Sequence, residues 1–586
     1  MKNNRGYLRT GTLLCALLLP ASLMAGCSAR PGPAPTVDPS EAAPTLDQGQ
    51  DNLSSANVDN RRSQLTIGID PVDSGFNPHL AANDYSFVQS LAALVFPSAF
   101  VQGQLNTDLL VSAEEIPPAE GAAQTIRYVI NPEAQWNDGT PISYADFYYL
   151  WDSMRDNPDV INGAGYRAIK AMRTSDGGKK IEVDFDQRIR DWNELFDNIL
   201  PAHLLKDATG GFDGALKTSI PASGGRYAVK DIDFARGIYT IVRNDRFWGN
   251  NPAATEVLQF REIRSVTQGV EMLRSGQINF VDASPTETAE LSYDLIPDAQ
   301  VRAWDRNSTL TIDFNTASTR MPTPELRKQL AGLIDTEQLA ILATGRRTNI
   351  AAIPKTINNN AAGNDSTADE LRALSNDTPL VIAADPADAT STSAATALVD
   401  MLAGKGVKAE VKLVELADIA RNLAPQGRID ATISWHRTPN TSLLLASAYG
   451  CSTAPTSTKE TEDQSDSTTT ATTTSTTPNT PSTQPGRYTP QAANLTQFCN
   501  PEINDALDHV IAGESDFEET KALVQRYNQE QTLTLPILND RRLDVLGRNI
   551  QGPKPELGQC PSSNQQEFYP PPPPGNPPDN PQAAPE

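Results

Sequence analysis

The stretch that decides the fold lies at residues 380–437 and reads "LVIAADPADATSTSAATALVDMLAGKGVKAEVKLVELADIARNLAPQGRIDATISWHR". It opens with a short apolar run, Leu380–Ala384, which is typical of a buried strand. Apolar residues then recur at helical spacing over 392–403, and the glycines Gly404 and Gly406 predict the end of that helix.

The second half of the stretch repeats this scheme. Residues 407–413 alternate as a strand, residues 416–423 fit a helix, and residues 429–435 alternate once more. The order β-α-β-α-β predicts parallel strands joined by right-handed crossovers. In open sheets of this kind, ligands bind beyond the carboxyl ends of the strands.

The end of the third predicted strand is therefore a candidate ligand loop. Trp435, His436 and Arg437 stand there in a row, followed by a turn that contains Thr438 and Asn440. A structural interpretation competes with this one. In it, Trp435 belongs to the core and the two basic residues form a solvated turn.

A second loop is predicted to reach the same cleft. A strand over 65–69 and a helix over 85–94 flank a long loop that carries Phe76, Asn77 and His79. The alternative is a purely structural loop in which Phe76 covers the core.

The amino terminus resembles a lipoprotein signal. In residues 1–26, three basic residues precede an apolar core too short to span a bilayer as a mature helix. Small residues directly before Cys27 resemble a bacterial lipobox, which implies cleavage there and diacylation of the Cys27 thiol. An ordinary secretory signal is the alternative. No later stretch is apolar enough to cross a membrane, so Cys27 would be the lipid anchor at the extracytoplasmic face of the cell membrane.

The net charge excludes one class of partner. The whole chain carries −24, and loss of Lys2, Arg5 and Arg9 with the signal would change this to −27. Such an acidic chain is not expected to bind nucleic acid.

Three segments have compositions that cannot bury a core. Residues 27–60 are predicted to be a disordered tether behind the lipidated cysteine, 452–487 a disordered Thr/Ser-rich insert, and 569–586 a Pro-rich disordered tail. The chain between them is too long for one core and predicts two or more lobes.

Three cysteines remain after Cys27 and the signal are set aside. In an oxidising, exported context, a disulfide between Cys451 and Cys499 is preferred because it would close the base of the insert. Pairings with Cys560 stay open, because sequence alone cannot choose among the three.

No pattern predicts catalysis or a cofactor. The chain has no GxSxG elbow, P-loop or HExxH motif, and no Cys/His cluster that would bind zinc. The four histidines lie far apart without ligand spacing. We therefore expect no enzyme activity, no cofactor and no metal.

Several motifs in order resemble one family. These are "WNDGTP" at 136–141, "RNDRFWG" at 243–249 and "SGQIN" at 275–279. Together they resemble the family 5 extracellular solute-binding proteins, the receptors of peptide and nickel ABC importers. The match covers roughly residues 62–550. Most of these motifs are structural. In Asp138-Gly139, for example, the acid accepts backbone N–H bonds and the glycine allows a positive φ.

The resemblance implies an α/β, two-lobed periplasmic-binding-protein-like fold of type II with an additional small domain. The expected limits are lobe I at 61–80 and 222–322, the small domain at 81–221, lobe II at 323–540, and a return to lobe I at 541–568.

One branch of the family fits better than the peptide receptors. The motifs "GFNPHL" at 75–80 and "ILPAHLLKD" at 199–207 resemble the LpqW-type lipoproteins of mycobacteria and corynebacteria. That resemblance implies a role in lipomannan and lipoarabinomannan synthesis, through binding of a mannolipid (a phosphatidylinositol mannoside) or of a membrane mannosyltransferase. The alternative is the receptor of a peptide importer, which would deliver its ligand to an ABC permease.

The candidate loop separates these two functions. Peptide receptors of the family commonly place an aspartate shortly after the equivalent tryptophan, where it pairs with the peptide amine. Here that position is Thr438, so the loop suits a phosphate, a carboxylate or sugar hydroxyls. An acid facing the cleft near Trp435, and a large hydrated cavity, would favour peptides, whereas inward-facing His436 and Arg437 in a shallow or greasy cleft would favour the mannolipid.

Overall fold

The computed structural model describes residues 63–72, 75–354, 369–453, 488–490, 494–548 and 550. Several predicted features lie outside these residues, namely the signal 1–26, Cys27, the tether up to 60, most of the insert 452–487, Cys560 and the tail 569–586. No helix in the described part of the chain has both the length and the apolar character needed to cross a membrane.

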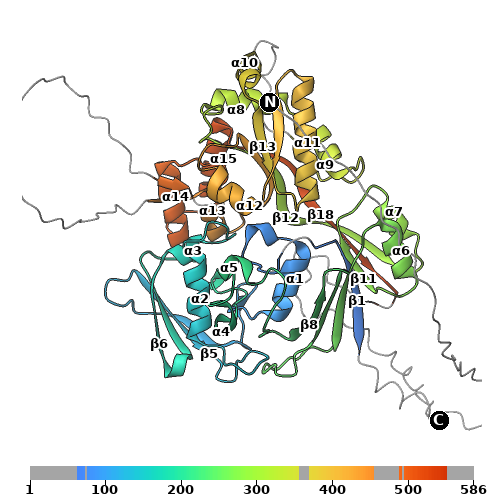
Figure 1. Cartoon of the computed structure of the whole chain (residues 1–586). Helices are drawn as coiled ribbons and strands as arrows, with labels where there is room; N and C mark the ends of the chain where they lie inside the picture. Colours follow the sequence, from blue (N-terminus) through green and yellow to red (C-terminus); the bar gives the residue numbers. More distant parts are fainter. Residues whose placement is uncertain are drawn as a thin grey trace, which may run out of the picture. The chain divides into compact units, whose positions relative to one another are not determined.

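A mixed sheet of ten strands forms the central element of the structure (Figure 1). Its strands, in spatial order, are β14 (Ala409–Leu413), β13 (Leu380–Ala384), β15 (Ala431–Arg437), β12 (Gln300–Phe314), β18 (Thr534–Leu546), β11 (Phe280–Ala283), β1 (Gln64–Ile69), β10 (Val257–Glu262), β9 (Ile238–Arg243) and β8 (Tyr227–Asp233). The two ends of this sheet belong to the two lobes of a periplasmic-binding-protein fold.

The predicted β-α-β-α-β unit is confirmed at one end of the sheet. β13 lies between β14 and β15 and is parallel to both. The first crossover is α11 (Ala389–Gly404), as the spacing predicts. The second consists of the short α12 (Leu416–Asp418) and a π-helical turn, Ile419–Leu423.

Two long strands, β12 and β18, connect the lobes. β12 pairs with β18 along most of its length, whereas only its Ser308–Phe314 half also pairs with β15. The pairing with β18 is interrupted between Asp305 and Thr309, where the register shifts. β12 thus takes part in the strand pairing of both lobes, and the limit expected between the lobes after residue 322 stays a prediction.

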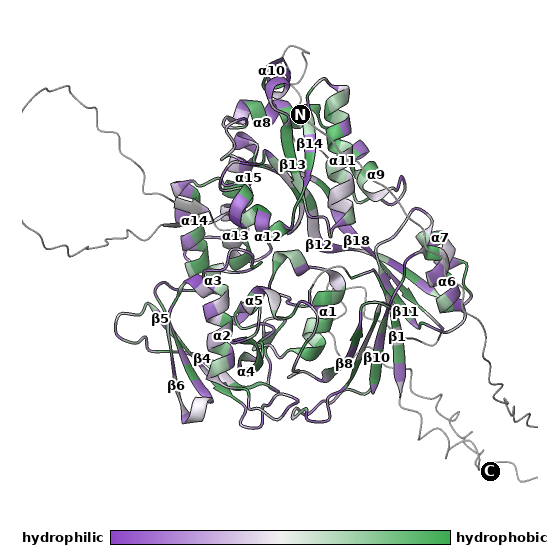
Figure 2. Cartoon of the chain, viewed as in Figure 1, coloured by the Kyte–Doolittle hydropathy of each residue, from purple (hydrophilic) through white to green (hydrophobic). Residues whose placement is uncertain are grey.

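The core of lobe II covers one face of these strands. Leu310, Ile312 and Phe314 alternate along β12 and are fully buried. They pack under three helices, α8 (Pro324–Leu333), α9 (Thr336–Thr344) and α11. The hydrophobic character of β13 in the same layer is visible in Figure 2. The opposite face of β12 carries polar residues.

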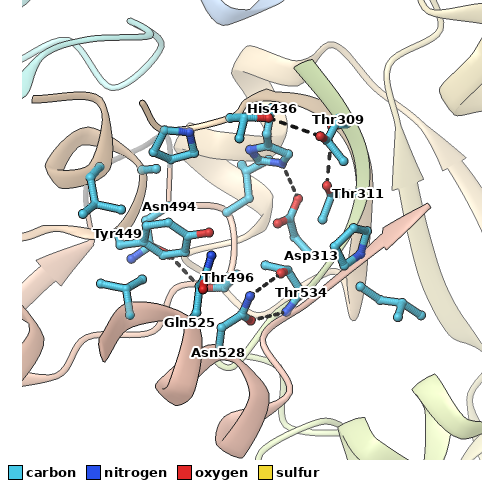
Figure 3. A pocket seen from close by; sticks show the side chains of 18 of the residues that line it. Thr309, Thr311, Asp313, His436, Tyr449, Asn494, Thr496, Gln525, Asn528 and Thr534 are labelled. Atoms are coloured by element: carbon cyan, nitrogen blue, oxygen red, sulfur yellow. Dashed lines mark hydrogen bonds and ion pairs between the residues drawn. The ribbon is translucent and has the colours of Figure 1, made fainter. Parts of the chain in front are cut away.

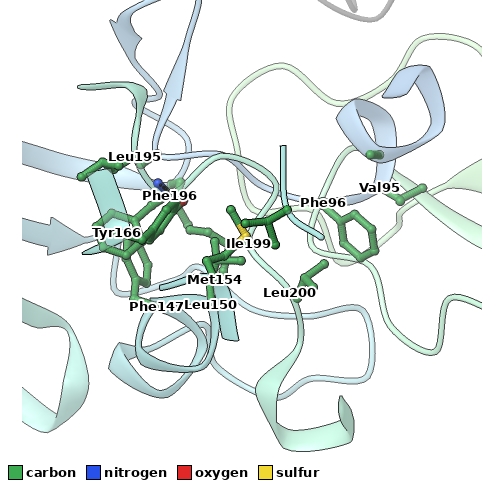
Figure 4. Packing of buried hydrophobic residues seen from close by; sticks show 14 of the residues in the cluster. Val95, Phe96, Phe147, Leu150, Met154, Tyr166, Leu195, Phe196, Ile199 and Leu200 are labelled. Atoms are coloured by element: carbon green, nitrogen blue, oxygen red, sulfur yellow. Dashed lines mark hydrogen bonds between the residues drawn. The ribbon is translucent and has the colours of Figure 1, made fainter. Parts of the chain in front are cut away.

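A second sheet lies within residues 81–221. Its order is β4 (Leu110–Ile116), β5 (Gln124–Ile130), β7 (Lys180–Phe185) and β6 (Ile169–Ser175), and α2 (Tyr144–Met154) accompanies it. Aromatic side chains fill its core, where the rings of Phe147 and Tyr166 lie 5.0 and 5.7 Å from that of Phe196 (Figure 4). The proposed limits of this small domain stay a prediction.

The remaining elements are shorter or cover the edges. They are α1 (Ser86–Val95), β2 (Phe100–Val101), β3 (Gln104–Leu105), α3 (Ala164–Arg167), α4 (Ala202–Leu205), α5 (Gly211–Gly214), α6 (Val266–Arg274), α7 (Ala289–Asp294), α10 (Asp369–Asp377), α13 (Ser442–Tyr449), β16 (Cys451–Thr453), β17 (Tyr488–Pro490), α14 (Pro501–Ala512) and α15 (Phe517–Gln531). The turn at Asp138 forms as predicted, since its carboxylate accepts the Thr140 N–H at 2.8 Å and Gly139 has φ of +95°.

Apolar contacts join lobe II to the small domain. Leu443 and Leu445 of α13 are buried in the same hydrophobic cluster as the side chains around Phe196. Hydrogen bonds reinforce this contact, because the Ser447 hydroxyl accepts the Ala164 N–H at 3.1 Å. The elements that follow β15 are thus held by both parts of the chain.

The preferred disulfide is confirmed between Cys451 and Cys499, which are 48 residues apart. Replacing both cysteines by serine should lower the free energy of unfolding by about 2–4 kcal/mol, because the link restricts the unfolded chain. Urea unfolding would measure the change. Cys560→Ser is the matched control and should leave the midpoint unchanged; an equal loss in the control would refute the assignment.

Candidate functional site

A polar cavity of about 420 Å³ lies against the second face of β12 and β15. Strand alternation creates it, since Thr309, Thr311 and Asp313 point away from the lobe II core and His436 lies opposite Thr309 on β15. α13 and α15 cover the space from the other side. Its volume is within the range of about 300–1,000 Å³ that is usual for small-molecule sites.

Hydroxyl and amide groups dominate the polar lining of this cavity, as Figure 3 shows. They come from Thr309, Thr311, Thr438, Asn494, Thr496, Gln525, Asn528, Gln529, Thr532 and Thr534. Many already bond to one another, as when Asn528 donates to the Thr534 hydroxyl at 2.7 Å. The Thr532 hydroxyl is different, because it is buried and has no hydrogen-bond partner among the described residues.

Asp313 and His436 form an ion pair at the wall of the cavity. The His436 Nε2 atom lies 2.7 Å from the Asp313 carboxylate, which is almost fully buried. Burial by itself would lower the pKa of His436, but the adjacent Asp313 carboxylate outweighs this and raises it above the usual value. The pair therefore favours an imidazolium whose Nδ1–H has no protein acceptor in the described part of the chain.

The same histidine also contacts a serine, yet the three residues do not form a nucleophilic triad. The Ser434 hydroxyl lies 3.1 Å from His436 Nε2, the nitrogen that also contacts Asp313. A triad needs the serine and the acid on opposite ring nitrogens, so that the acid can orient a base which accepts the serine proton. The arrangement suits hydrogen bonding to a ligand better than proton transfer from Ser434.

Tyr449 supplies an aromatic ring to the cavity. Burial, with a smaller contribution from the nearby Asp313 charge, raises the pKa of Tyr449 to about 12. Its hydroxyl therefore stays protonated at neutral pH and can donate or accept a hydrogen bond. A half-buried ring of this kind also offers an apolar face to a ligand.

The charge of the Arg437 guanidinium is compensated by Asp84, which lies far away in the sequence. Its Nε and Nη2 atoms donate to the two Asp84 carboxylate oxygens at 2.8 and 2.7 Å. Arg306 of β12 donates to the same carboxylate and, at 2.8 Å, to the Asp84 backbone carbonyl. Burial would raise the pKa of the Asp84 carboxyl, but the two guanidinium groups outweigh it and hold that pKa well below its usual range.

A smaller cavity of about 80 Å³ lies on the other side of His436 and Arg437. Trp435 lines it and also packs against the lobe II core, since it faces away from the larger cavity. Trp435, unlike His436, does not line the larger cavity, and its predicted role in ligand binding stays a prediction. Alternation along β15 places the two side chains on opposite faces.

The other predicted residues divide between the cavity and the protein interior. Thr438 lines the larger cavity, whereas Asn440 is exposed and lines neither cavity. Phe76, Asn77 and His79 are buried and also line neither. They stabilise their own loop instead, because the Asn77 amide donates to the Phe212 carbonyl at 2.8 Å and the His79 ring bonds the Asn198 carbonyl at 3.0 Å.

Sequence reasoning missed Asp313, Tyr449 and Thr532. The alternation of "STLTIDF" at 308–314 was a usable signal, because it places two threonines and an aspartate on one strand face. Asp313 also places a carboxylate beside the candidate loop, and this acid is supplied by a strand that is distant in the sequence. Within the described residues, no group of three or more His, Cys, Asp or Glu side chains is placed to hold a metal ion.

Two lobes joined by β12 and β18, with a cavity between the lobe II strands and the helices α13 and α15, are the architecture of a solute-binding protein. The chain belongs to the bacterial extracellular solute-binding proteins of family 5, whose profile (family 5 Middle) matches residues 113–455, more than half of the chain. Members of this family are binding proteins, not enzymes, and its relatives are extracellular or periplasmic.

Two kinds of relative are informative. The probable monoacyl phosphatidylinositol tetramannoside-binding protein LpqW of Mycobacterium tuberculosis is 28% identical over 615 residues, which cover 92% of this chain and 94% of that protein. Among solved structures, AgaA of A. tumefaciens R10 in complex with agropinic acid has a TM-score of 0.62 at 16% identity, covering 86% of this chain and 98% of AgaA. AppA of Bacillus subtilis in complex with a nonapeptide has a TM-score of 0.61 at 13% identity, covering 87% of this chain and 99% of AppA. These two structures support the fold alone.

Asp84→Ala should destabilise the protein by about 3–5 kcal/mol, because it leaves two partly buried guanidinium groups without their shared carboxylate. Since the folded pKa of Asp84 is lowered, its contribution is present above an unfolded value of about 3.9 and is lost as the pH falls toward the folded value. Urea unfolding at pH 7 and pH 3 would measure this. Asp207→Ala, in an exposed ion pair, is the control and should change stability by less than about 0.5 kcal/mol.

Asp313→Asn should lower the pKa of His436, because burial then acts without the compensating charge. In the parent protein the raised pKa stabilises the fold fully below an unfolded value of about 6.5, and this contribution is lost as the pH rises through the folded value. Imidazole NMR titration would resolve the shift among four histidines. Asp505→Asn removes a carboxylate beside His509 and should leave His436 unchanged; an unshifted His436 in Asp313→Asn would refute the pairing.

Proposed function

We propose that this protein is a cell-envelope lipoprotein that binds a mannosylated lipid through its sugar hydroxyls in the cavity beside His436. In this role it supports lipomannan and lipoarabinomannan synthesis. It does so by binding a mannolipid of that pathway or a membrane mannosyltransferase. Diacylated Cys27 would hold it at the extracytoplasmic face of the membrane. The similarity to LpqW along nearly the whole chain supports this proposal, because that relative is named for binding a phosphatidylinositol tetramannoside.

The observation that carries the proposal is the chemistry of the larger cavity. Its lining is rich in threonine hydroxyls and amides, and the buried Thr532 hydroxyl has no protein partner in the described part of the chain. A buried hydroxyl without a partner costs about 1–3 kcal/mol, which a ligand hydroxyl would recover. Sugars present many groups that can both donate and accept, so they match such a lining.

Charge pairing argues for a neutral group in this place. The sequence left a phosphate or carboxylate open as ligand for Arg437, but that guanidinium already binds Asp84 in a two-bond contact. His436 is likewise paired with Asp313. Lys521, at the edge of the cavity, has Glu518 at 4.0 Å and the Phe517 ring at 5.4 Å. An anionic ligand would meet His436 and Lys521 beside the carboxylates that already pair with them, which would repel it, whereas a neutral sugar would meet no such repulsion.

A second function, the receptor of a peptide importer, is favoured by Asp313 and by the volume and polar lining of the larger cavity. This carboxylate lines the cavity and would be the partner for a peptide amine. Its engagement with His436 weakens the case, since an amine would compete with an existing ion pair. Peptide binding would therefore strengthen as the pH rises and His436 loses its proton, whereas binding of a neutral sugar would depend less on pH.

Native mass spectrometry would separate the two functions. The protein from residue 28 onward keeps the whole structured unit, which begins at residue 62. It would be mixed with phosphatidylinositol tetramannoside and, separately, with a mixed peptide pool. Retention of the mannolipid and no peptide is the expected result. Retention of peptides alone would indicate that the protein is the receptor of a peptide importer. Retention of neither the mannolipid nor a peptide would refute a ligand-binding role for the cavity.

Two matched variants test the cavity itself. Thr532→Val removes the unpartnered hydroxyl, so it should stabilise the fold by about 1 kcal/mol and weaken mannolipid binding by about two- to tenfold. Thr432→Val is the control, because the Thr432 hydroxyl is also buried without a partner in the described residues but lines neither cavity. It should stabilise the fold and leave binding unchanged. Equal binding by both variants would contradict the proposed site.

A further inference from the structure

The smaller cavity has walls of a different character from the larger one. Most of its lining is apolar, with Ala82, Val160 and Leu416 among the contributors. Four residues, His436, Arg437, Ala448 and Leu495, line both cavities, so the two spaces adjoin along these side chains. A hydroxyl-rich space and an apolar space thus adjoin at the end of β15.

We propose that the two cavities are the two halves of one site for an amphiphile, whose neutral sugar occupies the larger cavity and whose short aliphatic segment next to the sugar occupies the smaller one. This inference rests on the proposed function and adds to it the chemical class of the ligand portion that follows the sugar. It assigns a role to the smaller cavity.

Ion pairs at the edge of the smaller cavity are consistent with an uncharged occupant. Asp84 is held by Arg306 and Arg437, and Asp159 is paired with Arg421. The second Asp159 oxygen is buried without a partner in the described residues. Burial is the main reason that the pKa of Asp159 is raised to about 6.

Lobe II and the small domain both contribute to the smaller cavity, unlike the larger one. Ala82, Asp84 and Val160 lie within the predicted limits of the small domain, whereas Leu416 and Trp435 come from lobe II. An aliphatic segment placed there contacts both sides and is removed from water only while they remain together. The apolar part of the ligand would therefore stabilise the association of lobe II with the small domain, and the sugar would bind within lobe II and its covering helices.

A series of alkyl mannosides tests the idea on the protein from residue 28 onward. Methyl, ethyl, butyl, hexyl and octyl α-D-mannopyranoside, each below its micelle concentration, would be titrated by calorimetry. Each methylene that enters the smaller cavity should raise the affinity by up to about fourfold. Because that cavity measures only about 80 Å³, the gain should stop after the first few carbons.

Two cavity-filling variants locate the effect. Ala417→Leu from lobe II and Ala82→Leu from the other side each place a larger side chain in the smaller cavity without touching the lining of the larger one. Each should abolish the chain-length gain and leave methyl mannoside affinity within about twofold. Ala403→Leu on the exposed side of α11 adds the same apolar group elsewhere and should keep the gain.

Each outcome separates the two proposals. Binding of methyl mannoside with no dependence on chain length would overturn the amphiphile site and leave the sugar site standing. A gain that continues to octyl, or that survives both filling variants, would place the aliphatic segment elsewhere and also overturn it. If no mannoside of any length binds, the proposed function fails, and the amphiphile site fails with it.

Discussion

The antiparallel pairing of β12 with β18 is the constraint on which the rest of the structure depends. Because these long strands run from one lobe to the other, they join the lobes within one sheet and determine which side chains face the cavity. Strand alternation then divides β12 into an apolar face, which builds the lobe II core, and a polar face with Thr309, Thr311 and Asp313. A shift of one residue would exchange the two faces.

The basic side chains of the site are paired with carboxylates from other parts of the fold. The candidate loop is basic in sequence, yet its arginine is held by Asp84 and its histidine by Asp313. Both acids come from segments far away in the chain. The consequence is a site whose arginine and histidine are already paired, so that shape and hydroxyl pattern, more than net charge, would select the ligand.

Apolar packing limits how this protein can move. Solute-binding folds close by hinge motion, and β12 and β18 are the strands that connect the lobes here. The helix α13, however, packs into the hydrophobic cluster of the small domain and bonds to it through Ser447. Opening would expose that apolar surface to water, which costs about 25 cal/mol per Å². A large opening therefore needs more than the loss of the Asp84 contacts.

The sequence by itself determined the elements whose evidence is local. Periodicity placed the unit from β13 to β15, turn chemistry placed Asp138 and Gly139, and the pairing of Cys451 with Cys499 was preferred from the position of the insert. The loop at 435–438 was placed at a strand end, where the cavity lies. Only the tertiary structure decided to which face of its strand each side chain points and with which distant carboxylate it pairs. Trp435 and His436 are neighbours in the chain but lie on opposite faces, and Asp313 reaches His436 through strand pairing across more than a hundred residues. Such contacts depend on register and on long-range pairing, which no local pattern encodes.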